Sequence, residues 1–512
     1  MLSIINSFGL MGIEGYLVKV EIDINRGLPG YDVVGLADTA IKESKQRVVS
    51  AIKNQGLNFP IDKVIINLAP ADTKKEGSFY DLPISVGILS ATNQLKTDKA
   101  ILSQFGFIGE LSLEGSLRQV KGILPILITA RNLGFKKVVI PYENANEASY
   151  IEGLEVYAVK DLKQLVTFLN AEESITPVQS FSYEHIKSKL KVVGDFSQIK
   201  GQASAKRALE ISAAGGHNVL MIGPPGSGKT MLARAFPSIL PDMTFDEALE
   251  VTKIHSIAGT LDKNVGIITE RPFRAPHHTS TTVALTGGGK NAKPGEISLA
   301  HNGVLFLDEM PEYSRQSIES LRQSLEDGTI TVARNAQTVE YPANFILIAS
   351  MNPCPCGNYG STQKQCKCSP NQIHKYLAKL SGPLMDRIDM YIEVDSVTYQ
   401  DISGEIVEEN SQTIKKRVDE ARQIQTRRFE GQKIYSNSKM TNTMIKKYCK
   451  LDKETNDILL LAFESLKLTA RAYNRILKVA RTIADLDNSE EIKKEHVIEA
   501  INYRSLDEKY WI

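Results

Sequence analysis

The chain has 512 residues, of which 42% are hydrophobic and 24% are charged, and its formal net charge is +1. A chain of this length is too long for a single hydrophobic core and predicts about three domains. The balanced charge excludes an overall basic field, so binding of nucleic acid would depend on local patches or an internal channel.

No stretch of about 18 apolar residues occurs, and the apolar start lacks a basic segment and a small-residue cleavage site. We therefore expect no signal peptide and no membrane partner. Four of the five cysteines fall within fifteen positions. This spacing differs from the dispersed framework of a secreted protein and favours a reducing cytoplasm.

Residues 1–170 combine alternating apolar runs, such as 18–24, with helical stretches, such as 38–53, and predict an α+β domain. Residues 171–195 predict a linker, because Ser, Thr, Pro, Gln and scattered charges follow one another there without periodicity.

Residues 196–395 alternate apolar runs with helical segments, which is typical of an α/β core with a parallel sheet covered by helices. The expected strands are 219–222, 303–307, 345–349 and 390–394. Residues 396–512 begin with a charged helical linker and continue as several amphipathic helices, which predicts an all-α end.

Residues 223–230 read GPPGSGKT between a predicted strand and a predicted helix, which is the context of a phosphate-binding P-loop. The glycines let backbone N–H groups surround phosphate oxygens, Lys229 reaches the β and γ phosphates, and the Thr230 hydroxyl binds Mg²⁺. We therefore expect ATP and Mg²⁺ to be bound by Gly223, Pro224, Pro225, Gly226, Ser227, Gly228, Lys229 and Thr230.

The strand predicted at 303–307 ends in two carboxylates. Asp308 would hold Mg²⁺, and Glu309 would orient and deprotonate the water that attacks ATP. Two solvated acids at the end of a buried strand are the alternative. The strand at 345–349 leads to Asn352, whose amide could sense the γ-phosphate or could be an ordinary turn residue.

Two arginines complete this set. Arg387 precedes the last expected core strand and could stabilise the charge that builds up on the transferred phosphoryl group, which requires a neighbouring subunit. A surface salt bridge with Asp386 or Asp389 is the alternative for Arg387. Arg471 begins a helix in the all-α end.

Cys354, Cys356, Cys366 and Cys368 form two close pairs. Four thiolates could make a closed, structural Zn²⁺ site, although C-x-C pairs are less usual than C-x-x-C; free thiols or a redox-sensitive pair are the alternatives. Cys449 has no predicted role. His277 and His278 are adjacent, so on regular structure their rings would point apart, which favours a structural or loop role over metal binding.

The segments GPPGSGKT, VLFLDE, SGPLMDRID and TARAYNR together resemble an AAA+ ATPase of the magnesium-chelatase-like branch, and RPFRAPHH at 271–278 with ARAYNRI at 470–476 narrows the resemblance to the YifB/ComM family. The resemblance covers the whole chain. It implies a homo-hexameric ring with ATP between subunits. The neighbouring subunit contributes Arg387, and the first subunit contributes Lys229, Thr230, Asp308, Glu309 and Asn352. Arg471 would be the second sensor, in a C-terminal helical lid.

Two insertions carry cations. The segment 286–296 is flexible and locally basic, and 328–340 alternates like a hairpin with its turn at residues 334–335. The resemblance implies that such insertions project into the channel of the ring, where Lys290, Lys293 and Arg334 would follow the backbone of single-stranded or branched DNA. Solvated surface loops are the alternative.

Within residues 64–144, segments such as KEGS at 75–78 and GELSLEG at 109–115 resemble the Lon-protease-like domain. Its catalysis needs a Ser–Lys dyad. The alignment puts Phe79 and Leu124 at these positions, so the resemblance implies a domain without the dyad, kept for docking or DNA contact. Ser78 with Lys121 is a conceivable substitute.

The sequence thus predicts a hexameric ATP-driven DNA motor, whose closest family members resemble branch-migration helicases in recombination during natural transformation. The alternative is a chelatase- or chaperone-like ATPase that remodels a protein partner. We expect a chelatase motor to lack the N-terminal domain, so the presence of this domain favours the DNA motor. An ATP-dependent protease would require the missing dyad.

Overall fold

The computed structural model describes residues 1–180, 194–262, 265–289, 292–334, 337–360, 364–396, 408–432, 434–506 and 510. It divides into two compact units, Met1–Lys189 with Phe245–Thr269, and Leu190–Thr244 with Glu270–Ile512. We expected about three domains, but the C-terminal helices share one hydrophobic core with the preceding sheet. The range 196–395 is also not one unit, because residues 245–269 belong to the first.

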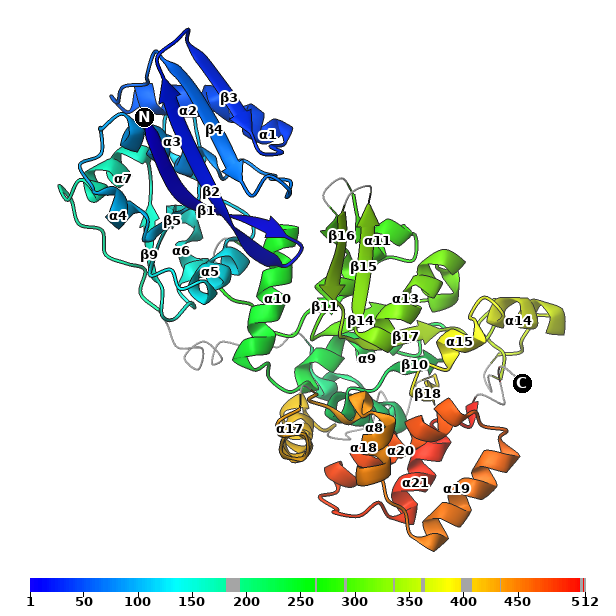
Figure 1. Cartoon of the computed structure of the whole chain (residues 1–512). Coiled ribbons are helices and arrows are strands. Elements are labelled where there is room, and N and C mark those ends of the chain that lie inside the picture. The colour runs from blue at the N-terminus through cyan, green and yellow to red at the C-terminus, as the bar shows by residue number, and fades with distance from the viewer. Residues whose placement is uncertain are drawn as a thin grey trace. The chain divides into compact units, whose positions relative to one another are not determined.

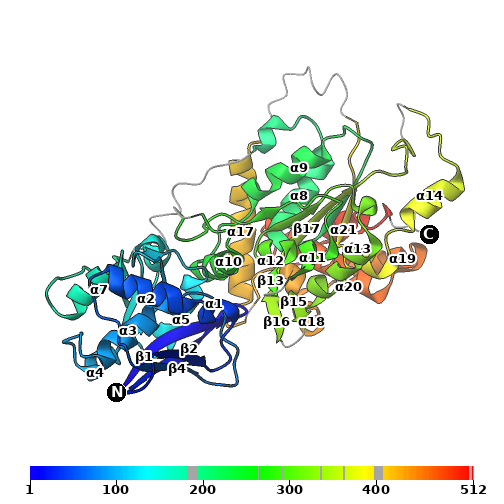
Figure 2. The ribbon, with the colours of Figure 1, turned by 90° about the horizontal axis from the view of Figure 1, so that it is seen from above.

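The first unit contains a seven-stranded mixed sheet in the order β3-β4-β2-β1-β5-β8-β9. Strand β2 alternates as the sequence predicts, with Val18, Val20, Ile22 and Ile24 buried. Helices α2, α3 and α5 cover one face of the sheet (Figure 2). The strands are β1 (Leu2–Met11), β2 (Glu14–Asn25), β3 (Gly30–Val34), β4 (Lys63–Ala69), β5 (Phe105–Phe107), β8 (Lys137–Pro141) and β9 (Glu155–Val159).

The helices of the first unit include α1 (Thr39–Lys42), α2 (Ser44–Asn54), α3 (Asp81–Ala91), α4 (Lys99–Leu102), α5 (Ile123–Asn132), α6 (Ala145–Ala148) and α7 (Leu162–Leu169). A two-residue ladder joins β6 (Glu110–Leu111) to β7 (Leu117–Arg118). Every residue of α3 is buried, as expected for a helix that is apolar on all sides.

Helix α10 (Phe245–Ala258) is part of this first unit, although it follows the P-loop by only a short distance in the chain. Its Ser256 hydroxyl donates to the Glu147 carboxylate at 2.8 Å and accepts the Gly122 N–H at 3.1 Å. Leu249 packs on the core of the unit. These contacts connect elements distant in sequence, so periodicity within α10 could not predict them.

The second unit contains a five-stranded sheet in the order β11-β14-β17-β10-β18, and every neighbouring pair is parallel. The four expected strands are confirmed, with β11 as an additional edge strand (Figure 1). They are β10 (Val219–Ile222), β11 (Phe273–Arg274), β14 (Val304–Leu307), β17 (Ile346–Met351) and β18 (Met390–Glu393). The fold is therefore mixed α/β with a parallel sheet, and the carboxyl ends of β10, β14 and β17 meet at one edge.

Helices of the second unit include α8 (Ala203–Gly215), α9 (Lys229–Ala235), α11 (Thr282–Thr286), α12 (Glu296–Leu299), α13 (Arg315–Asp327), α14 (Pro370–Leu377), α15 (Gly382–Met385) and α17 (Ser411–Arg428). The C-terminal group consists of α18 (Asn442–Tyr448), α19 (Lys453–Ser465), α20 (Ala470–Leu486) and α21 (Lys494–Asn502) (Figure 1). In α17, Ile414, Val418 and Ala421 recur at helical spacing and are buried together.

Across the described ranges, no helix combines the length and the apolar content that crossing a membrane requires.

Candidate active site

The P-loop joins the end of β10 to the start of α9. Gly226 and Gly228 have φ of 79° and 92°, a backbone conformation that side chains other than glycine disfavour. The Lys229 Nζ donates to the carbonyl oxygens of Gly223 at 2.7 Å and Pro224 at 2.8 Å. Lys229 is only 8% exposed, so its cation lies inside the loop where a phosphate would approach.

Burial lowers the pKa of Lys229 to about 8, against the opposing effect of Asp308 and Glu309. A lysine must carry its proton to attract phosphate. We therefore expect the Kd for ATP to rise about tenfold for each pH unit above 8, since binding must then take up a proton. Fluorescent-nucleotide titrations between pH 7 and 9.5 measure this slope. The same slope in a Lys229→Met variant would assign the effect to another group.

Asp308 follows β14 and contacts two hydroxyl groups. Thr230 Oγ1 donates to its Oδ2 at 2.9 Å, and the Ser350 hydroxyl donates to its Oδ1. Ser350 Oγ also accepts the Glu309 N–H at 3.2 Å. Sequence reasoning missed Ser350, whose signal was a polar residue near the end of an otherwise apolar strand. Oxygen donors of this kind suit Mg²⁺, and Thr230 with Asp308 would hold it beside the P-loop.

Glu309 adopts a left-handed backbone conformation with φ of 52°, which is uncommon for a residue with a side chain and recurs at functional sites. Its carboxylate is not packed away, because 53% of its side chain is exposed. His278 Nδ1 lies 4.0 Å from Glu309 Oε2. Glu309 and Asp308 line the same cleft, where the Glu309 carboxylate could act as a base.

A cleft of about 280 Å³ lies over these groups. Thr230, Arg234, His278, Asp308 and Glu309 are among its lining residues. Three neighbouring strands thus bring a hydroxyl, a guanidinium, an imidazole and two carboxylates to one place. Together they can bind a nucleotide phosphate chain, neutralise its charge and activate a water.

The rings of His277 and His278 would point apart on regular structure, but they lie close together here. Their centroids are 4.1 Å apart, and His277 Nδ1 lies 2.8 Å from Thr279 Oγ1. The two residues lie in an irregular segment, where the alternation of a strand does not apply. Both rings line the cleft, so His278 joins the candidate site.

Lys229 and the P-loop residues before it are not among the lining residues of this cleft, and neither are Asn352, Arg387 and Arg471. Asn352 follows β17 directly and is half-buried. Arg387 is 8% exposed, donates to the Pro383 carbonyl at 2.6 Å and forms an ion pair with Glu326. Arg471, at the start of α20, is 59% exposed. Their roles stay predictions.

The salt-bridge alternative for Arg387 named the wrong partners. Asp389 forms its ion pair with Arg475, and Asp386 lies 3.9 Å from Arg471, while Glu326 on α13 pairs with Arg387. Burial and the nearby arginines, Arg322 first, lower the pKa of Arg387. Arg387 is close in sequence to Asp386 and Asp389. This closeness did not indicate which carboxylate pairs with Arg387 in the fold.

Both cationic insertions form hairpins. The pairs are β12 (Gly287–Gly288) with β13 (Lys293–Pro294), and β15 (Thr329–Arg334) with β16 (Gln337–Pro342). Lys293 is exposed. Lys290 lies outside the described residues, as do the side chain of Arg334 and the predicted turn at 335. The Tyr341 hydroxyl donates to the Ala292 carbonyl at 2.9 Å, which joins the two hairpins to each other.

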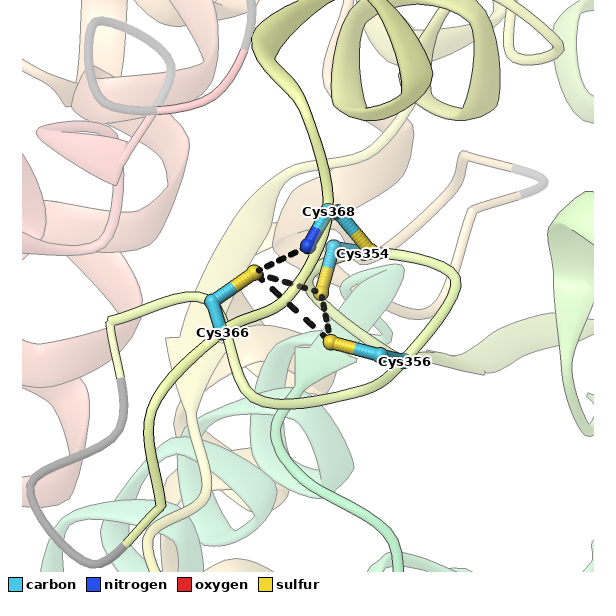
Figure 3. Close-up of side chains that lie close together, drawn as sticks. All are labelled: Cys354, Cys356, Cys366 and Cys368. Carbon is cyan, nitrogen blue, oxygen red and sulfur yellow. Dashed lines mark hydrogen bonds between the residues drawn. The ribbon is translucent and has the colours of Figure 1, made fainter.

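The four clustered cysteines converge, although their loop has no regular structure (Figure 3). The backbone N–H groups of Lys367 and Asn358 lower the pKa of Cys356 to about 6. Cys449 is buried elsewhere, among the C-terminal helices.

In the first unit, Phe79 and Leu124 belong to the hydrophobic core. The Ser78 hydroxyl donates to the Glu110 carboxylate. The Lys121 side chain lies against Gly259. The partner of Ser78 is thus an acid rather than the lysine of the conceivable substitute dyad.

Comparison with known proteins covers nearly the whole chain. The family model described as magnesium chelatase, subunit ChlI, matches residues 195–402, and that described as its C-terminal part matches 408–504. The Competence protein ComM of Haemophilus influenzae is 42% identical over 99% of this chain and 98% of its own length. The uncharacterized protein YifB of Escherichia coli is 41% identical over 99% and 97%.

The chelatase proteins are more distant. The magnesium-chelatase subunit ChlI of Guillardia theta is 28% identical over 44% of this chain and 64% of its own length. A third family model, described as subunit ChlI of Mg-chelatase, matches residues 20–144.

Proposed function

This chain belongs to the YifB/ComM family of magnesium-chelatase-like proteins, and from that premise we propose that it is a homo-hexameric AAA+ motor that couples ATP hydrolysis to translocation or branch migration on DNA. The family implies ATPase activity. Recombination and natural transformation are the processes to which we assign the motor, since its relative from Haemophilus influenzae is named a competence protein.

For hydrolysis, the P-loop N–H groups and Lys229 bind the phosphates. Thr230 and Asp308 hold Mg²⁺, which neutralises phosphate charge when bound. Ser350 fixes the Asp308 carboxylate by its hydrogen bond. Glu309 takes the proton of the attacking water and directs its oxygen toward the γ-phosphorus, and Asn352 contacts the γ-phosphate.

Arginines from two places complete the proposed site. Arg387 comes from the neighbouring subunit, where it exchanges Glu326 for the γ-phosphate of the next P-loop. A guanidinium stabilises the charge that spreads over the phosphoryl oxygens. Arg471 is the second sensor, and its exposed position at the start of α20 leaves it accessible for that role.

The observation that supports DNA as the partner is the hydrogen bond between the two cationic hairpins. The Tyr341 hydroxyl on β16 donates to the Ala292 carbonyl next to β13, which links the β15–β16 hairpin to the β12–β13 hairpin. The two linked hairpins carry the predicted DNA contacts Lys290, Lys293 and Arg334, whose charges would follow a phosphate backbone without reading its sequence.

Replacement of Lys290, Lys293 and Arg334 by Ala is expected to weaken DNA binding at least tenfold at moderate salt and to flatten its dependence on salt, because about three phosphate contacts are lost. ATP hydrolysis without DNA should persist. Fluorescence anisotropy with single-stranded, branched and duplex DNA, at several salt concentrations, measures the change. The control is Lys416→Ala, an exposed lysine on α17.

A chelatase- or chaperone-like remodeller is the second candidate, favoured by the three family models described as chelatase subunit parts. The same experiment separates the two functions. If no DNA stimulates ATP hydrolysis and no salt-sensitive binding occurs, the DNA motor is excluded. For the first unit, we propose a Lon-protease-like domain without its dyad, used for docking or DNA contact.

A further inference from the structure

The four cysteines at 354–368 present their sulfur atoms to a common centre (Figure 3). All four Sγ atoms lie within 4.8 Å of one another. The Sγ of Cys354 lies 3.4 Å from that of Cys356 and 3.7 Å from that of Cys366, and Cys356 and Cys366 are 3.6 Å apart. All four are free thiols rather than disulfides.

These separations fit a single small ion. A Zn–S bond of about 2.3 Å in a tetrahedron places neighbouring sulfurs about 3.8 Å apart. A cluster with several irons would hold the sulfurs further from one another, because its thiolates are distributed over different irons. The four thiolates leave no coordination position open, which is typical of a structural site.

The surrounding backbone supports thiolates at this centre. The Tyr359 N–H donates to Cys354 Sγ at 3.3 Å, and the Cys368 N–H donates to Cys366 Sγ at 3.4 Å. Such N–H donors to the ligand atoms hold them in place and stabilise their charge. Cys354 is fully buried, so a metal bound to it would be shielded from solvent on that side.

The cysteine loop packs directly against the P-loop. Gly357, with φ of 77°, closes a turn in which its N–H donates to the Cys354 carbonyl at 2.9 Å. A Cβ on Gly357 would lie 2.5 Å from Cδ of Pro225, so the Gly357 backbone packs on the Pro225 ring as closely as glycine allows. The same loop begins two residues after Asn352.

We propose that Cys354, Cys356, Cys366 and Cys368 bind one structural Zn²⁺, and that this ion fixes the turn at Gly357 against Pro225 and thereby holds the phosphate-binding loop in shape. Binding of the ion releases the thiol protons to solvent. The first half of the proposal is independent of the proposed function; the second half rests on the P-loop's binding of nucleotide.

Metal analysis of the full chain tests whether the four cysteines bind zinc. The protein purified with zinc in the medium is expected to contain about one Zn²⁺ per chain, because the site is closed and fully thiolate. The double variant Cys366→Ser, Cys368→Ser should lose it, whereas Cys449→Ala should keep it. Wild-type protein stripped of metal should bind Co²⁺ with the absorption bands of tetrahedral thiolate coordination. Wild-type protein that holds no zinc after reconstitution and gives no such bands would overturn the site, whatever the variants do.

The nucleotide affinity of the wild-type protein tests whether the zinc ion holds the P-loop in shape. The metal is removed with a chelator, the chelator is removed and Mg²⁺ is restored, and the Kd for a fluorescent ADP is measured before and after zinc is returned. The Kd is expected to rise about tenfold without zinc and to recover with it, as for other groups that position a site. Gly357→Ala should also weaken binding while the zinc content stays unchanged. If the Kd does not change when zinc is removed, the ion does not hold the P-loop in shape, although the zinc site itself would stand. If zinc-loaded protein binds no nucleotide, the result contradicts the proposed function instead.

Discussion

Replacement of Glu309 by Gln is expected to lower kcat for ATP hydrolysis by about 10²- to 10⁴-fold, which is the contribution of a positioned general base. The amide cannot accept the proton of the attacking water. It keeps the size of the side chain and the left-handed backbone at this position. The P-loop and Asp308 are untouched, so affinity for ATP should stay within about twofold of the wild type.

Steady-state phosphate release and binding of a fluorescent nucleotide measure these two effects separately. Glu312→Gln is the matched control, because Glu312 lies three residues further on and pairs with Lys379 at 3.4 Å, away from the cleft. The control should hydrolyse ATP normally. Wild-type turnover in Glu309→Gln would remove Glu309 as the base.

Loss of the Arg475 guanidinium is expected to destabilise the second unit by about 3 kcal/mol, because a carboxylate in the core then loses its arginine partner. Asp389 is 3% exposed, accepts the Asn218 N–H at 2.8 Å and forms its ion pair with Arg475. These contacts tie α20 to the start of β18. Arg475→Met preserves most of the apolar stem, so the change isolates the charge.

The midpoint of chemical unfolding, followed by a probe in the second unit, measures this loss. Arg471→Met is the control one turn earlier on α20, since Arg471 is 59% exposed and lies 3.9 Å from Asp386. Its effect on stability should stay below about 0.5 kcal/mol, as for other exposed pairs. If both variants unfold alike, the buried pair does not hold the helix to the sheet.

The same pair predicts how stability depends on pH. Burial alone would raise the pKa of Asp389, but Arg475 and His217 hold the pKa of this carboxyl well below its ordinary value of 3.8. A lowered folded pKa means that the stabilisation is complete above the unfolded pKa and is lost as the pH falls below about 4. In Arg475→Met this acid-dependent loss should shrink.

Local residue patterns determined the elements of this protein and the kinds of chemistry they carry. Glycine spacing predicted the P-loop, apolar runs predicted β10, β14, β17 and β18, and alternation predicted the β15–β16 hairpin. Each of these signals depends on neighbours within a few residues, because backbone conformation and side-chain periodicity are local properties. The resemblance of short motifs then gave the family.

Only the tertiary structure decided which distant groups meet. It placed the Ser350 hydroxyl on Asp308, paired Arg387 with Glu326, and brought α10 into the first unit. It also gathered the four cysteines and set their loop against Pro225. These contacts follow from strand order, helix packing and loop paths, which depend on the free energy of the whole chain and leave no periodic trace in the sequence.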